Sequence, residues 1–150
     1  MIKSVIAKVA ATAGLALTAA TVAAGPAQAA GQYNDSLSLV GPTIYQTNNY
    51  YTSASVGSTV TPNGPIITVG WDYSFNTALP AGTTMKVDLC NATKGCVSTG
   101  TGYGWTDAFN GLPANSKFYY RFNLSSSTTK VLNPPISGAR DYITVGFMQP

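Results

Sequence analysis

The sequence predicts an all-β protein: a single-domain antiparallel β-sandwich with one short-range disulfide, preceded by a cleaved signal peptide. Three observations support this prediction. Large apolar residues alternate with small or polar ones in several runs, clusters of Gly, Pro and Asn separate these runs, and no segment after Ala30 has a convincing helical period. Runs that have one apolar face each, with no crossover helices between them, favour packed antiparallel sheets.

The first 29 residues have the pattern of a secretory signal peptide. Met1–Lys8 is a short basic region, and Val9–Ala24 is uncharged and rich in Ala, Leu and Val. After a Gly-Pro helix breaker, Ala27 and Ala29 place small residues at both positions that a signal peptidase reads. The apolar stretch is diluted by alanine and ends early, whereas a membrane-spanning helix needs about 20 apolar residues. Cleavage after Ala29 leaves residues 30–150 as one β-sandwich domain. We expect this domain in the periplasm or secreted, with no stable membrane insertion.

Alternation predicts four main strands in the mature chain. They are Ile67–Phe75, Met85–Leu89, Phe118–Leu124 and Ile143–Phe147. In the first run every second residue from Ile67 is large and apolar, so five bulky side chains are expected on one face of a sheet. Most of the alternating aromatic residues are expected in the core: Trp71, Tyr73, Phe75, Phe118, Tyr120 and Phe122. Two earlier runs, 36–40 and 43–51, are polar at their edges and predict further strands.

Clusters of turn-forming residues separate the predicted strands. They lie at 62–65, 79–82, 111–115 and 133–135. The serine- and threonine-rich segment Ser125–Thr129 is predicted to be the tip of a hairpin. No internal repeat or interdomain linker interrupts the mature chain, and a single domain of about 120 residues is long enough to bury a core.

Cys90 and Cys96 predict a disulfide, because an even, closely spaced pair in an exported chain is usually bonded. Asn91, Lys94 and Gly95 favour a turn between them, so the bridge is expected to join two adjacent strand ends. Redox-active pairs usually have two intervening residues at a helix start, and neither condition holds here. The loop is short, so we expect the bridge to contribute about 2 kcal/mol.

The composition excludes several classes of function. The chain has no His and no Glu, and its only acids are five Asp residues. Without His, neither a Ser-His-Asp triad nor an imidazole zinc site can form. The formal charge of +3 falls to +1 when Lys3 and Lys8 leave with the signal peptide, and this charge does not attract nucleic acid. We therefore expect no cofactor, no metal and no nucleic-acid partner.

From Trp71 onward, the order of features resembles a known family. The features are Trp71-x-Tyr73-x-Phe75, Leu79–Gly82, the Cys90 and Cys96 pair, Thr106–Ala114, the aromatic strand Phe118–Phe122 and Leu132–Pro135. Over residues 66–147 this order is similar to the FlhE family of flagellar proteins, which are small exported β-sandwich proteins with a signal peptide and a close Cys pair. The segments 32–64 and 139–147 depart from the family pattern.

The resemblance implies a periplasmic accessory of the flagellar export apparatus, acting as a chaperone or as a guard against proton leak through the export gate. It implies no catalytic residues.

The acids offer one candidate catalytic pair. A glycosidase-like hydrolase needs two facing carboxylates, and Asp72 and Asp88 would meet this need on neighbouring strands. The favoured alternative is a solvated sheet face, beside Lys86 and Ser74, on which these acids form cross-strand charge pairs. No motif marks a Ser-Lys nucleophile pair either, so we expect no enzyme.

Four large aromatic residues are left over when alternation has assigned the core: Tyr50, Tyr51, Tyr103 and Trp105. The segment Thr99–Trp105 is too rich in glycine for a regular strand interior. Amphipathic rings on such a segment suit either sugar stacking or a contact with a protein partner. The alternative is that Trp105 covers the end of the sandwich as a lid on the core.

The sequence therefore predicts a non-enzymatic periplasmic accessory protein that acts in flagellar protein export or assembly through protein–protein contacts, with the flagellar export apparatus as the expected partner. The alternative is a secreted β-sandwich that binds carbohydrate or an envelope polysaccharide through its exposed Tyr and Trp. A small hydrolase with an Asp pair is the least favoured class.

Overall fold

A computed structural model describes residues 31–59 and 64–149, which form an all-β fold without helices. The predicted signal peptide, residues 1–29, lies outside the described residues. The described part of the chain contains eleven strands: β1 (Gly31–Val40), β2 (Ile44–Gln46), β3 (Tyr50–Thr52), β4 (Val56–Gly57), β5 (Ile66–Asp72), β6 (Thr84–Asn91), β7 (Gly95–Ser98), β8 (Tyr103–Thr106), β9 (Lys117–Ser125), β10 (Val131–Ile136) and β11 (Arg140–Gln149). All their pairings are antiparallel, which confirms the predicted fold class.

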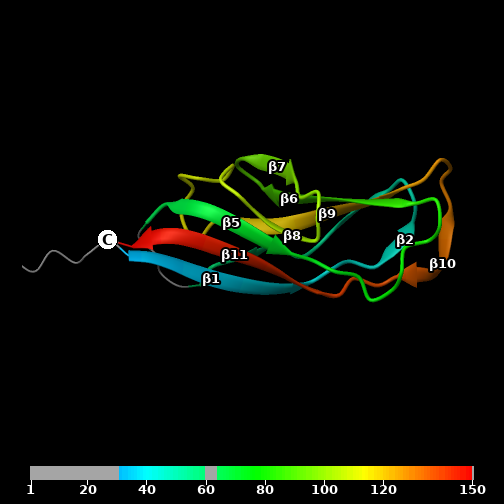
Figure 1. Cartoon of the computed structure of the whole chain (residues 1–150), viewed down its shortest axis with the longest axis horizontal. Helices are drawn as coiled ribbons and strands as arrows, with labels where there is room; N and C mark the ends of the chain where they lie inside the picture. The colour runs from blue at the N-terminus through cyan, green and yellow to red at the C-terminus, as the bar shows by residue number, and fades with distance from the viewer. Residues whose placement is uncertain (1–30, 60–63, 150) are drawn as a thin grey trace, which may run out of the picture.

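The first sheet has four strands in the order β1-β11-β5-β8. β1 pairs with β11 along its whole length, from Gly31 opposite Gln149 to Val40 opposite Arg140. Figure 1 shows β1, β11 and β5 lying side by side. The first and last described strands are therefore neighbours, and β1 and β8 form the two edges of this sheet.

The second sheet has the order β3-β9-β6-β7, with β4 also paired to β9. Its longest pairing joins β6 to β9, from Thr84 opposite Ser125 to Asn91 opposite Phe118. β2 and β10 form a separate two-stranded sheet at the end of the molecule that lies on the right in Figure 1.

The core lies between the two larger sheets and is built from inward-facing alternate residues. Its fully buried members include Val69, Ile143 and Val145 from the first sheet and Leu89, Phe118, Tyr120 and Phe122 from the second. The hydroxyl of Tyr120 ties the sheets together, because it donates to the carbonyl of Tyr142 at 2.6 Å and accepts from the N–H of Asp72 at 3.3 Å. Burial raises the pKa of Tyr120 well above its ordinary value, so the hydroxyl remains a neutral donor.

The prediction for the run 67–75 is wrong at both ends, because β5 ends at Asp72 and Ile67 does not face the core. The register of β11 against β5 shifts by one residue near Ile67, so this residue is the extra one of a β-bulge. Ile66 is consequently buried in place of Ile67, which is only half-buried. The predicted period of two holds beyond the bulge, and the later aromatic members of the run pack half-buried against the core: Trp71, Tyr73 and Phe75.

Three further predictions are wrong. The run 43–51 contains two strands rather than one, because Asn48 adopts a positive φ of 62° between β2 and β3. The prolines of 133–135 lie inside β10 rather than in a turn. β10 can contain them because it pairs only with β2 and in irregular register, so few of its backbone N–H groups must donate hydrogen bonds. The segment 125–129 joins strands of different sheets and is therefore not a hairpin tip.

Two predicted turns and the disulfide are confirmed. The turns at 79–82 and 111–115 each contain a glycine at positive φ, Gly82 at 72° and Gly111 at 83°. The cluster at 62–65 lies largely outside the described residues. Cys90 and Cys96 are bonded and lie opposite each other in the β6–β7 hairpin. Within the described residues, no helix long and apolar enough to span a bilayer is present.

Candidate functional site

The outward face of the first sheet carries a cluster of exposed aromatic side chains beside a groove. The buried residues Val69, Ile143 and Val145 mark the inner face, so the residues between them face outward. A groove of about 310 Å³ lies on this outward face, and its lining residues are Ser36, Gly70, Trp71, Asp72, Tyr103, Gly104, Trp105, Tyr142 and Thr144. We call this surface the aromatic groove.

Two cross-strand rows build the aromatic groove. In one row Trp105 of β8 lies opposite Gly70 of β5, and in the next row Tyr103 lies opposite Asp72, which in turn lies opposite Tyr142 of β11. Tyr103, Trp105 and Tyr142 are 77%, 61% and 40% exposed. No ring–ring contact within the described residues involves these three side chains. Their aromatic surface is therefore open to solvent or to a partner.

Trp105 lies over the backbone of Gly70 on this outer face. A Cβ atom at position 70 would come within 2.5 Å of Cζ3 of the indole, so any larger residue there would displace the ring. The indole therefore rests on the sheet with one face and remains exposed on the other. Trp105 does not cover the end of the core as a lid, because it lies on the side of the sheet that faces away from the core.

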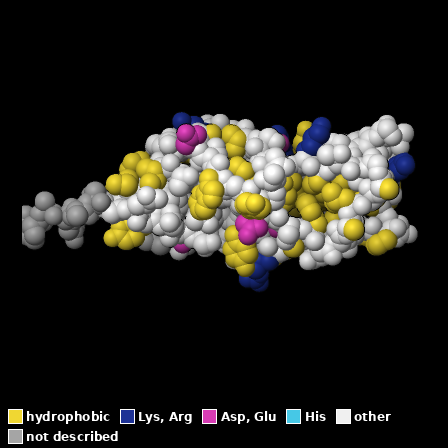
Figure 2. Space-filling model, in the orientation of Figure 1, with side chains coloured by type: hydrophobic (Ala, Val, Ile, Leu, Met, Phe, Trp, Pro, Cys, Tyr) yellow, Lys and Arg dark blue, Asp and Glu magenta, His cyan; other side chains and the backbone are white. Residues whose placement is uncertain are grey.

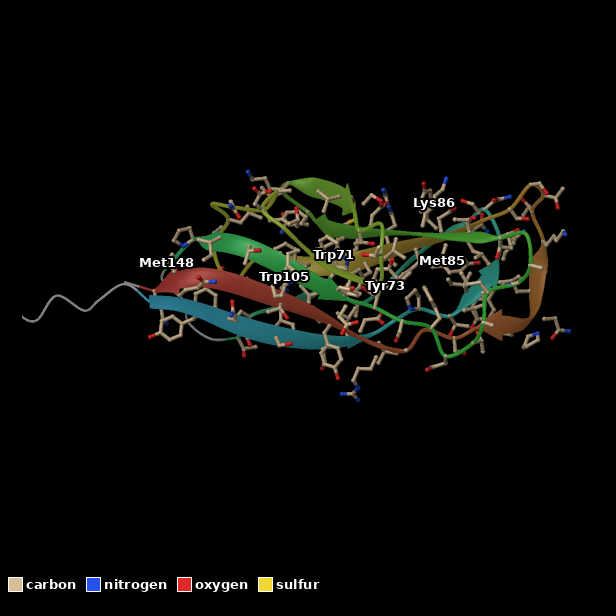
Figure 3. All side chains as sticks on the ribbon, viewed as in Figure 1. Trp71, Tyr73, Met85, Lys86, Trp105 and Met148 are labelled. Carbon is tan, nitrogen blue, oxygen red and sulfur yellow. A yellow bond between two sulfur atoms is a disulfide. The ribbon has the colours of Figure 1, made fainter. Side chains whose placement is uncertain are left out.

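Trp71 makes the complementary contact on the opposite side of the same two strands. Its indole lies against Gly104, where a Cβ atom would collide with Cζ2 of the ring. Its Nε1–H donates to the carbonyl of Thr101 at 2.9 Å, and the ring packs against the core. Figure 3 labels both tryptophans on their neighbouring strands.

The prediction of an irregular segment at 99–105 is wrong in its second half, because Tyr103–Thr106 is strand β8. Gly102 and Gly104 allow neighbouring groups to approach the backbone closely, and they do not form a flexible loop. A Cβ atom at Gly102 would lie 3.1 Å from the carbonyl oxygen of Tyr73, and Gly104 makes room for the Trp71 ring. Only Gly100, at a φ of 67°, needs a turn conformation.

The other two predicted contact residues lie elsewhere. Tyr50 and Tyr51 belong to β3 of the second sheet, so they do not join Tyr103 and Trp105 in one surface. Tyr51 packs against the core, whereas Tyr50 is 65% exposed. The guanidinium of Arg121 lies 4.9 Å from the centre of the Tyr50 ring, so one face of this ring already has a partner.

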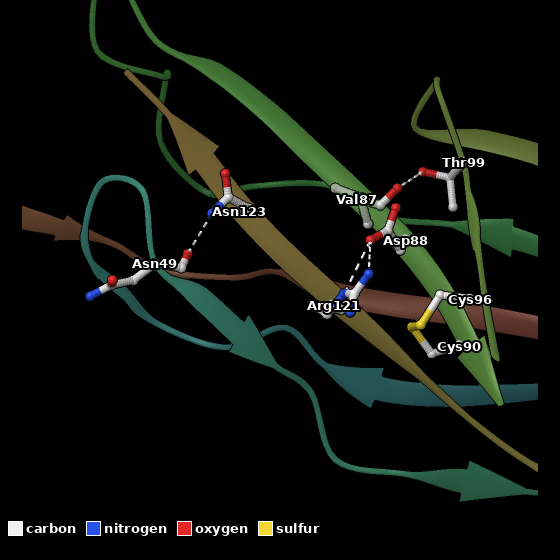
Figure 4. A network of polar contacts seen from close by, with 8 residues as sticks. All are labelled: Asn49, Val87, Asp88, Cys90, Cys96, Thr99, Arg121 and Asn123. Atoms are coloured by element: carbon white, nitrogen blue, oxygen red, sulfur yellow. Dashed lines mark hydrogen bonds and ion pairs between the residues drawn. A yellow bond between two sulfur atoms is a disulfide. The ribbon is translucent and has the colours of Figure 1, made fainter. Parts of the chain in front are cut away.

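The outward face of the second sheet is polar and charged. Asp88 and Arg121 lie opposite each other on β6 and β9, and their ion pair has a distance of 2.7 Å (Figure 4). This is the cross-strand charge pair expected for Asp88. The disulfide between Cys90 and Cys96 lies further along β6, in the β6–β7 hairpin (Figure 4).

The structure does not bring the candidate catalytic acids together. The prediction that Asp72 and Asp88 occupy neighbouring strands is wrong, because β5 belongs to the first sheet and β6 to the second. Each carboxylate faces outward from its own sheet, so the two lie on opposite sides of the sandwich and cannot flank one substrate. No group of three or more Asp, Glu, His or Cys residues among those described could hold a metal ion.

Asp141 is a buried acid that the sequence analysis missed. It is fully buried on the inner face of β11, where Oδ1 accepts the N–H of Ser74 at 3.1 Å and Oδ2 has no partner within the described residues. Burial raises its pKa to about 6. Asp72 lies on the outer face of the adjacent strand, so these acids do not form an accessible pair either. The sequence did contain a signal for the burial of Asp141, because the alternation in β11 places its odd-numbered residues inward.

Tyr142 lines the aromatic groove, and the sequence analysis missed it. The run 143–147 starts one residue after it, so the alternating pattern did not show that Tyr142 faces outward beside the aromatic groove. Gly70 was also overlooked as a partner of Trp105. The cross-strand register that joins these residues depends on long-range pairing, which a single sequence does not provide.

Comparisons with known proteins agree with the sequence resemblance. The sequence model of a family described as flagellar protein FlhE matches residues 41–148, which extends the predicted match of 66–147 toward the N-terminus. A crystal structure of FlhE is similar in fold, with a TM-score of 0.65 and 23% sequence identity over 79% of this chain and 96% of that chain. No curated protein gives a significant match.

Proposed function

Because this chain belongs to the FlhE family of flagellar proteins, we propose that it is a non-enzymatic periplasmic accessory that acts in flagellar protein export or assembly through protein–protein contacts. Its action there is either that of a chaperone for exported subunits or that of a guard at the export gate. The family has no known catalytic role, and membership together with the Cys90–Cys96 disulfide suggests an exported protein.

The aromatic groove is the observation that carries this proposal. Protein contact surfaces are enriched in Trp and Tyr near their centres and depleted of charge. Trp105 and Tyr103 are exposed on strand β8, and within the described chain no Lys or Arg lines the groove. On the side of the molecule seen in Figure 2, hydrophobic side chains lie among uncharged ones and charged side chains are few. A partner that binds here would bury aromatic area without having to desolvate many charges.

A genetic experiment tests the proposed process and compartment together. Deletion of the gene is expected to reduce swarming or to change the amount of exported flagellar protein, and the full chain is expected to restore both. A form without residues 2–29 keeps the β-sandwich but loses the predicted signal, so it should not restore them. Unchanged motility and export in the deletion strain would contradict the proposal.

The absence of catalysis has its own test. Asp88→Asn keeps the size of the side chain and removes its charge. This variant should restore motility as the wild type does, because Asp88 is paired with Arg121 on the second sheet, away from the aromatic groove. A variant that folds normally but fails to restore motility would favour a hydrolase.

A second candidate function, binding of an envelope polysaccharide, is favoured by the polar lining of the same groove. Hydroxyl groups of Ser36 and Thr144 and the carboxylate of Asp72 lie among the aromatic residues, and rings flanked by such groups suit sugar stacking. Co-sedimentation of the mature chain with purified peptidoglycan sacculi tests this function. Loss of co-sedimentation in Trp105→Ala would support it, whereas no co-sedimentation of the wild type would remove it.

A further inference from the structure

The edge strand β8 has main-chain groups that no described residue pairs. β8 bonds to β5 on one side only and is the last strand of the sheet order. The N–H of Tyr73 donates to the carbonyl of Gly102 at 2.8 Å, which makes these two residues a hydrogen-bonded pair of the antiparallel ladder. Such pairs alternate with non-bonded ones, so Gly104 and Thr106 also bond toward β5. Tyr103 and Trp105 consequently direct their main-chain groups away from the sheet.

Three of these outward main-chain groups remain free within the described chain. They are the N–H of Tyr103 and both the N–H and the carbonyl of Trp105, since the carbonyl of Tyr103 already accepts the hydroxyl of Thr101 at 2.7 Å. The side chains of the same two residues are the most exposed aromatic ones in the aromatic groove. One short edge therefore presents both hydrogen-bonding groups and large apolar surface.

The opposite edge of the sheet, β1, shows what a protected edge looks like in the same molecule. β1 is longer, and its alternate residues also face solvent, but their side chains are mostly short and polar: Gln32, Asn34, Ser36 and Ser38. Asp35 points inward between them and is half-buried, which disfavours pairing with another strand. β4 also lies beside β1. None of these protections is present at β8.

We propose that the partner of this protein binds as an extended peptide segment that adds a strand to the free edge of β8. This rests on the proposed function, and it specifies the binding mode: main-chain hydrogen bonds at Tyr103 and Trp105 give affinity, and alternate side chains of the segment pack on Trp105 and Tyr103. The segment is short, because β8 has four residues and turns bound it at Gly100 and Asp107.

Charge defines the chemistry of the segment further. The exposed acids Asp72 and Asp107 flank β8, one opposite Tyr103 and the other directly after Thr106. A segment with apolar residues at alternate positions and a Lys or Arg at its ends therefore complements this edge, whereas acidic ends are repelled.

Amide exchange by NMR tests the proposal with a defined probe. The probe is a peptide of alternating Val and Thr with a Lys at each end, added at millimolar concentration to the mature, isotope-labelled chain. In the free protein, the amides of Tyr103 and Trp105 should exchange rapidly, whereas those of Gly104 and Thr106 should be protected by β5 and serve as internal controls. The peptide should slow exchange at Tyr103 and Trp105 and leave the two controls unchanged.

Matched probes and variants separate the main-chain and side-chain contributions. A peptide that is N-methylated at alternate residues should not protect these amides, and a peptide with Glu at both ends should bind more weakly than the Lys peptide. Trp105→Ala keeps the N–H and should weaken binding roughly tenfold. Trp105→Pro also removes the N–H and should abolish binding, and a circular dichroism melt verifies that both variants are folded.

Several results would overturn the proposal. They are no shift of β8 resonances by the Lys peptide, shifts at Trp105 without protection of its amide, protection at β1 instead, or a dimer of the free mature chain that already protects Tyr103 and Trp105. Protection by a polysaccharide in place of the peptide would overturn it as well. The proposed flagellar role is tested in cells by gene deletion, so it can hold when this binding mode fails.

Discussion

Trp71 and Trp105 are two tryptophans on neighbouring strands, and each lies over a glycine of the other strand. Trp71 of β5 covers Gly104, and Trp105 of β8 covers Gly70. The local geometry is the same, but the surroundings differ: Trp71 packs on the core and donates to Thr101, whereas Trp105 is 61% exposed and has no hydrogen bond within the described chain. On one face of this strand pair the contact belongs to the core, and on the other face the same contact leaves an indole ring largely exposed.

Truncation of the two tryptophans should separate these roles most clearly. Trp71→Ala removes core packing and a hydrogen bond, so the free energy of unfolding should fall by about 3 kcal/mol. Trp105→Ala removes a largely solvated ring, so the loss should stay below about 1 kcal/mol. Urea unfolding followed by circular dichroism measures both. Equal losses would show that the two faces of the strand pair do not differ in this way.

A pH titration of stability extends the comparison to the acids of the two faces. The pKa of buried Asp141 is about 6 in the folded protein and 3.8 in its ordinary environment. Between these values the folded state holds a proton that the unfolded state has released, so the free energy of unfolding should fall as the pH rises from about 4 to about 6. The loss is on the order of 2–3 kcal/mol, and stability should be level above this range.

Asp141→Asn tests this assignment. The variant should flatten the fall between about pH 4 and 6, because an amide does not titrate. A profile that is unchanged by Asp141→Asn would assign the pH dependence to another group.

Substitution of the two glycines under the tryptophans should destabilise the protein to different extents. Gly104→Ala places a methyl group against the Trp71 ring, which the core and Thr101 hold in place, so we expect a loss of about 2 kcal/mol from overpacking. In Gly70→Ala the exposed Trp105 ring can rotate away, and the loss should be under about 1 kcal/mol. Thermal melts of both variants check the difference, and a larger loss in Gly70→Ala would contradict it.

The smallest effect is expected on the outward face of the second sheet. Arg121→Ala removes the ion pair with Asp88 and the contact with Tyr50, both at partly exposed positions. Such pairs contribute roughly 0.5 kcal/mol, and the contribution should shrink in high salt. A double-mutant cycle with Asp88→Ala, measured at low and high salt, checks this value. A coupling energy well above about 1 kcal/mol would show that this ion pair stabilises the fold more than an exposed ion pair does.

The sequence predicted the features of this fold that depend on local pattern. Alternation and turn residues were sufficient for the β-class, for the strand that contains Trp71 and for the Cys90–Cys96 hairpin. Local pattern failed where the register changes: the bulge at Ile67 arises from pairing with β11, and the strand character of β8 arises from Gly104 accommodating Trp71. Neither effect is visible in the residues of one segment alone.

The site was predicted in part for the same reason. Trp105 and Tyr103 stood out because alternation did not assign them to the core. Tyr142 and Gly70 complete the aromatic groove only because β11, β5 and β8 lie side by side, and this neighbourhood joins residues far apart in the chain. Tyr50 and Tyr51 were grouped with the site by composition, and the topology separates them.

Trp105→Ala is expected to lose function without losing stability, and one paired measurement tests this expectation. The thermal midpoint of the purified variant is compared with its ability to restore motility in the deletion strain. Tyr50→Ala is the control, since Tyr50 is similarly exposed, at 65%, on the other sheet. We predict a near wild-type midpoint and lost motility for Trp105→Ala, with both retained in Tyr50→Ala. Restored motility in Trp105→Ala, or a motility loss that accompanies a large fall in its midpoint, would contradict a role of Trp105 in partner binding.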